Sequence, residues 1–127
     1  MVATMTRSAV AALLDADAGL DGWTVYAEPP EQLTGARCVI LAPQSPYIDL
    51  DTFGTERLHL TVHIAVVRSH GPAMDTLDAG IAAVRSVLRG IDSCELESVA
   101  GVGLLQDIGG PEYVVAAQEM SVERANE

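Results

Sequence analysis

The chain has 127 residues, of which 49% are hydrophobic and only 4% aromatic, so we expect one domain with an aliphatic core. Eighteen Asp and Glu residues stand against seven arginines and no lysine, giving a formal net charge of −11. That charge argues against binding the outside of nucleic acid, which needs clustered cations, and disfavours attachment to anionic lipid. No apolar run is long enough to span a bilayer, and the start does not resemble a signal peptide. We therefore expect a cytosolic chain with Cys38 and Cys94 as reduced thiols.

The first predicted element is a helix over residues 6–18, where apolar residues recur at helical spacing. Thr6 or Thr4 can cap its start, because a hydroxyl accepts from the unpaired amides of the first turn. Gly19 is placed to end the helix in a left-handed turn. Asp15 and Asp17 lie at its carboxyl end, where the helix dipole makes negative charge mildly unfavourable.

Two strands are predicted next, over residues 23–27 and 37–42. The second is almost wholly apolar, so we expect both of its faces to be covered. Residues 43–55 contain two prolines, a glycine and two aspartates, and we expect them to form a loop. A loop of this length in a compact domain is often functional or becomes ordered on a partner.

Residues 58–66 give the clearest strand, because apolar residues alternate strictly with other types. One side is Leu, Leu, Val, Ile and Val, whereas the other begins with His59, Thr61 and His63. This alternation predicts an antiparallel strand with one buried face.

A second helix is predicted over residues 72–89, with Pro72 at its first position and Gly90 at its end. Two more strands are expected over 95–100 and 112–123, joined by a loop or hairpin connection, with a frayed tail over 124–127. The order is α-β-β-β-α-β-β within a single domain, residues 1–127. It indicates an α+β fold, a mostly antiparallel sheet with two helices packed on one face.

No pattern for catalysis is found. His59 and His63 would lie about 13 Å apart on a strand, too far to share one zinc ion. The glycines of residues 101–110 lack the third glycine of a dinucleotide loop and the lysine of a mononucleotide loop. We therefore predict no catalytic, cofactor-binding or metal-binding residues, and a protein that is not an enzyme.

Several short phrases, together with the element order, form a recognisable set across residues 39–124. They are Val39-Ile40-Leu41-Ala42-Pro43 with Pro46-Tyr47, Thr52-Phe53-Gly54-Thr55-Glu56-Arg57, Met74-Asp75-Thr76-Leu77-Asp78 and Gly110-Pro111-Glu112-Tyr113. This set resembles the tail terminator family of long-tailed bacteriophages, particularly those that infect GC-rich actinobacteria.

The resemblance implies a small α+β protein of the virion that assembles in the host cytoplasm as a hexameric ring. Such a ring caps the head-proximal end of the tail tube, stops its polymerisation and meets the head completion proteins. DNA passes through the bore without specific binding, and no membrane or cofactor is involved. A strongly acidic bore would repel phosphates, which is compatible with this role.

Contacts to a ring neighbour or to the tube are expected from two groups of residues. The first is the apolar part of the predicted loop, and the second is the polar side of the alternating strand: Tyr47, Ile48, Leu50 and Phe53, then His59, Thr61 and His63. In the alternative interpretation of the loop, Ile48 and Phe53 pack into the core instead.

Two other functions remain open from the sequence. The first is a different connector or neck protein that completes the head–tail joint with a similar small fold. The second is a small cytosolic ligand-binding or enzyme domain that uses the sheet face with His59, Thr61 and His63. This second function predicts a concave pocket at that face with titratable groups of shifted pKa.

Overall fold

The structure is a computed structural model that describes residues 6–30, 35–52, 54–68, 72–91, 94–106 and 112–125. It confirms the predicted α+β class and the predicted order of helices and strands, with one short 3₁₀ helix added. The elements are α1 (Arg7–Asp15), η1 (Ala18–Leu20), β1 (Thr24–Tyr26), β2 (Arg37–Thr52), β3 (Thr55–Val67), α2 (Ala73–Arg89), β4 (Cys94–Gln106) and β5 (Glu112–Ala125).

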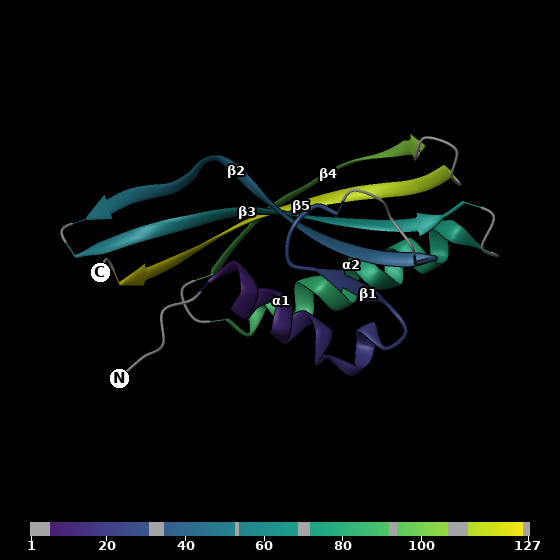
Figure 1. The fold of residues 1–127 in the computed structure, drawn as a ribbon, viewed down its shortest axis with the longest axis horizontal. Helices are drawn as coiled ribbons and strands as arrows, with labels where there is room; N and C mark the ends of the chain where they lie inside the picture. Colours follow the sequence, from purple (N-terminus) through teal and green to yellow (C-terminus); the bar gives the residue numbers. More distant parts are fainter. Residues whose placement is uncertain are drawn as a thin grey trace.

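The strands form a single sheet in the order β1-β2-β3-β5-β4. The short β1 pairs with β2 in parallel, and the other neighbours are antiparallel. Both helices lie on one face of this twisted sheet, as the sequence predicted (Figure 1). The main core is therefore a layer between the helices and the sheet.

The alternation predicted for β3 is confirmed. Leu58, Leu60, Val62, Ile64 and Val66 are all buried in the main core, whereas the intervening His59, Thr61 and His63 are half-buried on the other face. The interior of β2 is likewise buried on both faces, because Val39 and Leu41 join the main core while Cys38 and Ile40 join a smaller cluster on the second face.

The first helix begins as predicted but ends earlier. Thr6 caps it, its hydroxyl accepting from the Ala9 amide at 3.1 Å. The prediction of a left-handed turn at Gly19 is wrong, because Gly19 lies inside η1. Asp17 explains the difference: its carboxylate accepts from the Gly19 amide at 3.0 Å and starts a new helical turn after α1 has ended.

The second helix differs slightly from the prediction at its start. Pro72 is its N-cap residue, and Ala73 occupies the first helical position. Its buried face consists of Ala73, Leu77, Gly80, Val84 and Leu88, and Gly90 caps its end. Within the described residues, no helix is both long enough and apolar enough to cross a membrane.

The prediction of a loop over residues 43–55 is wrong, because β2 continues through this segment to Thr52. Ile48, Asp49 and Leu50 pair with Leu58, Arg57 and Glu56 of β3. The prolines are tolerated because a register shift separates Pro43 from Ile48, and β1 pairs with β2 only near its start. The turn of this hairpin includes Gly54 with a φ of 90° and lies beyond the ends of both helices (Figure 1).

The last two strands are also longer than predicted. β4 runs on to Gln106 and β5 to Ala125, so neither residues 101–106 nor residues 124–125 are the expected loop or frayed tail. These residues form strands because the neighbouring strands supply partners for their backbone N–H and C=O groups, which the residue types alone do not show. Two register shifts in β4, at Leu96/Val99 and Ala100/Gly103, accommodate its irregular stretch.

Candidate functional site

The polar side of β3 lies on the sheet face opposite the helices. His59, Thr61 and His63 alternate along the strand and stand in register with Ser121, Glu119 and Ala117 of β5. They share a face, as the sequence predicted, but they are spread along the strand and do not converge on a common point. Among the residues that the structure describes, no group of three or more His, Cys, Asp or Glu side chains could hold a metal ion.

The two histidines on this face are partly withdrawn from water. The Nε2 atom of His59 is buried and has no hydrogen-bond partner within the described chain. Burial lowers the pKa of His63, because removal from water disfavours the charged imidazolium. The pocket that the structure describes lies on the helical side of the sheet, away from these histidines.

An arginine-centred cluster at the outer end of the same face was not predicted. Arg57 of β3 donates to the Ser121 hydroxyl at 3.2 Å and pairs with Glu123 at 3.4 Å and with Glu95 of β4 at 3.7 Å. The cluster therefore joins three strands through one guanidinium. The alternation of residue types along β3 predicts the sheet face on which Arg57 lies. Only the order of the strands in the sheet brings Glu95 beside it.

The predicted contact residues of the hairpin separate into two groups. Tyr47 packs against the main core, and its hydroxyl accepts from Nη1 of Arg7 at 3.4 Å, which ties the start of α1 to β2. Ile48, by contrast, is 42% exposed, so for this residue the interpretation that it packs into the core is wrong. Leu50 pairs through its backbone with Glu56, whereas its side chain and all of Phe53 lie outside the described residues.

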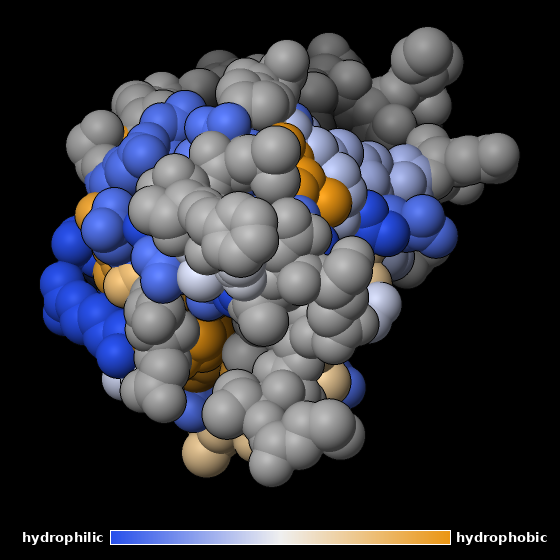
Figure 2. Space-filling view, turned by 90° about the vertical axis from the view of Figure 1, so that its left-hand side faces the viewer, coloured by the Kyte–Doolittle hydropathy of each residue, from blue (hydrophilic) through white to orange (hydrophobic). Residues whose placement is uncertain are grey.

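The molecule is polar at the end where this hairpin turns. Figure 2 views that end and shows mainly hydrophilic residues among those coloured, with hydrophobic ones in small separate areas. Among the described residues, the large apolar side chains classed as exposed are Leu13, Ile48 and Met74, which lie on α1, β2 and α2. Apolar contact points are therefore dispersed over several sides of the chain.

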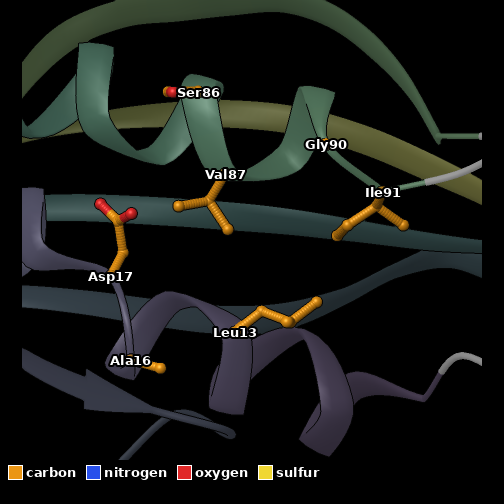
Figure 3. Close-up of a pocket in the computed structure, with 7 residues that line it drawn as sticks. All are labelled: Leu13, Ala16, Asp17, Ser86, Val87, Gly90 and Ile91. Atoms are coloured by element: carbon orange, nitrogen blue, oxygen red, sulfur yellow. The ribbon is translucent and has the colours of Figure 1, made fainter.

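A groove on the helical layer was also not predicted. It has a volume of about 330 Å³ and lies between the carboxyl-terminal parts of α1 and α2, which run antiparallel (Figure 3). The side chains of Leu13, Val87 and Ile91 extend into the space between the two helices, and Asp17 contributes a carboxylate at its side. The sequence predicts the two helices that carry or adjoin these residues. Only the packing of α1 beside α2 creates the groove between them.

No protein-family model matches this chain, and no curated protein sequence matches it either.

Proposed function

We propose that this protein is a structural component of a bacteriophage tail, a tail terminator whose copies form a ring on the head-proximal end of the tail tube. In this role the ring ends tube polymerisation and joins the tail to the head, and DNA passes through its bore. The family resemblance across residues 39–124 suggests the role, and the α+β fold that it implied is the fold of this chain.

The observation that carries the proposal is the projecting β2–β3 hairpin. Its turn extends past both helices. Ile48 in the β2 strand of this hairpin is 42% exposed, which places an apolar side chain on the surface of a strongly acidic chain. The arm is anchored at its base, because Tyr47 packs on the core and bonds to Arg7. A firmly anchored arm with an exposed apolar side chain is suited to contact a neighbouring subunit or the tube.

The charge of the chain supports the same role. Each copy carries −11, so a ring of copies would repel DNA phosphates and let the duplex pass without sticking. Association of such acidic copies needs specific contacts that outweigh their mutual repulsion.

The test is the length of tail tubes. Purified tube protein is polymerised with and without the chain, and tube lengths are measured by negative-stain electron microscopy. We expect the chain to shorten and cap the tubes, with a ring visible at one end. Tubes of unchanged, uncontrolled length and bare ends would reject the terminator function.

Variants make this test specific. Ile48→Asp should weaken capping at least tenfold without changing the thermal midpoint, because its side chain is exposed. Met74→Asp is the matched control, since Met74 is a 47% exposed apolar residue on α2, away from the hairpin. In a phage deleted for the gene, overlong tails indicate a terminator, whereas tails of normal length that fail to join heads indicate a different neck protein.

A further inference from the structure

The groove between α1 and α2 is negative at the end where α1 stops. Ala16 is the C-cap residue of α1 and Gly90 that of α2, and both line the groove. The helices run antiparallel, so these two negative helix ends lie at opposite ends of the groove (Figure 3), and Arg89 in the last turn of α2 offsets the end of that helix. The Asp17 carboxylate adds to the negative end of α1 and is held in place by the amide of Gly19.

The chain itself does little to offset this charge on the α1 side. The last turn of α1, which the structure describes in full, has no basic residue and contains Asp15. A carboxylate at this position is unfavourable for the helix itself. Beneath the charge, Leu13, Val87 and Ile91 provide an apolar floor, and Leu13 is 44% exposed. An apolar floor beside a negative rim suits the aliphatic stem and cationic head of an arginine.

Two arginines of α2 present the opposite charge. Arg85 and Arg89 are four residues apart and share one face of the helix. Neither makes a hydrogen bond or ion pair within the described chain, and Nε of Arg85 is buried without an acceptor there. All other arginines have a partner: Arg7 with Tyr47, Arg37 with Gly22, Arg57 with Glu123, Arg68 with Glu112 and Arg124 with Glu56.

The arginine face and the groove point in different directions on one helix. The groove residues Ser86 and Gly90 each follow an arginine by one position, which is about 100° around the helix. The two surfaces are thus complementary in charge but separate in place. An intermolecular contact between them would be head-to-tail, which closes into a ring if the rotation allows it.

We propose that the arginine face of one copy, Arg85 and Arg89 on α2, docks into the α1–α2 groove of the next copy. This inference rests on the proposed ring function and identifies the contact between its subunits. Arg89 of one copy meets Asp17 and the carboxyl end of α1 of its neighbour, and its stem covers the neighbour's Leu13. A volume of about 330 Å³ is at the small end of the range of ligand cavities, which is about 300–1,000 Å³, and fits one or two side chains.

The test uses two variants that each remove one side of the contact. Leu13→Arg places a cation in the groove at an exposed position, and Arg89→Glu reverses the exposed end of the arginine face. Sedimentation velocity is run on the full-length chain with and without tail tubes. We expect the native chain to form closed rings and each variant by itself to stay monomeric, with association at least tenfold weaker.

The mixture of the two variants is decisive. Each variant keeps one intact surface, so the equimolar mixture should form a dimer and nothing larger. Arg68→Glu is the control for charge, because Arg68 is 62% exposed and the substitution changes the net charge as much as Arg89→Glu does. This control should assemble as the native chain does.

The outcomes separate this contact from the proposed function. If both variants still form rings that cap tubes, or if their mixture stays monomeric while native rings form, the contact is wrong and the terminator function stands. A native chain that remains monomeric both alone and on tubes overturns the contact. If Leu13→Arg weakens binding to the tube protein but leaves the rings intact, the groove holds the tube and the proposed subunit contact is wrong. If the chain self-associates through this contact but does not change the length of tail tubes, the contact is correct and the terminator function is rejected.

Discussion

Gly80 of α2 lies so close to Trp23 that a Cβ atom at position 80 would come within 2.5 Å of Cη2 of the indole ring. The same atom would be 3.2 Å from Cγ2 of Ile64 on β3. Glycine inside a helix costs about 1 kcal/mol relative to alanine, so local preference does not explain this residue. Gly80 instead lets the helix approach the sheet with Trp23 packed between them.

We therefore expect Gly80→Ala to lower the free energy of unfolding by about 1–3 kcal/mol, the usual cost of overpacking a core. This loss should appear in urea denaturation despite the better helix propensity of alanine. In a Trp23→Leu background the clash is removed, so the same substitution should be neutral or stabilising. An equal loss in both backgrounds would contradict the role given to the Trp23 contact.

The ion pair between Glu56 and Arg124 should stabilise the fold more than a surface pair does. Their side chains are only 15% and 13% exposed, and Nε of Arg124 lies 3.1 Å from Oε1 of Glu56. Glu56→Leu or Arg124→Met should each cost about 1–3 kcal/mol, because each removes one side of an ion pair that is shielded from water. The double variant should recover part of that loss in a double-mutant cycle.

The matched comparison is the pair between Arg68 and Glu112, whose side chains are 62% and 34% exposed. Exposed pairs couple by about 0–1 kcal/mol, because water and salt screen them. A coupling energy for the Glu56 pair no larger than that of the Arg68 pair would show that burial adds nothing at this position.

His63 should make the fold less stable in mild acid. Burial lowers its pKa in the folded chain, whereas the unfolded histidine titrates near 6.5. The contribution of His63 is therefore fully present above pH 6.5 and is lost as the pH falls below that value towards the folded pKa. His63→Gln should flatten the fall in stability between about pH 6.5 and 5 relative to the native chain. An NMR titration that places the His63 pKa above 6.5 would contradict this prediction.

Cys94 should be an unreactive thiol. Burial, followed by the charge of Glu95, raises its pKa to about 11, and Arg57 opposes this shift. The unfolded thiol titrates near 9.0, so stability is full below pH 9 and declines as the pH rises towards 11. In a Cys38→Ala background, iodoacetamide at pH 8.5 should react about 100-fold more slowly with the folded than with the unfolded chain.

Glu95→Gln provides the check on the electrostatic part of this shift. It removes a charge that disfavours the thiolate, so the pKa of Cys94 should fall and alkylation should become several-fold faster. Equal rates in both variants would assign the whole shift to burial.

Strand pairing accounts for the main errors in the sequence prediction. The prolines and aspartates of residues 43–52 are typical of a loop, yet this segment is a strand because β3 supplies partners for its backbone. Gly103 and the residues around it form part of β4 for the same reason. In both cases the partner is the next strand along the chain, but the residues of the segment itself are poor strand formers, so local preference did not reveal the pairing.

Side-chain periodicity by itself determined the α+β class, the buried face of β3 and the buried stripe of α2, because the repeats of two and of three to four residues depend only on local backbone geometry. Only the tertiary structure decided that Ile48 stands exposed on a strand, that Arg57 joins Glu95 and that α1 and α2 form a groove between them. Each of these depends on which segments become neighbours, and that is set by packing of the whole core rather than by any single stretch of sequence.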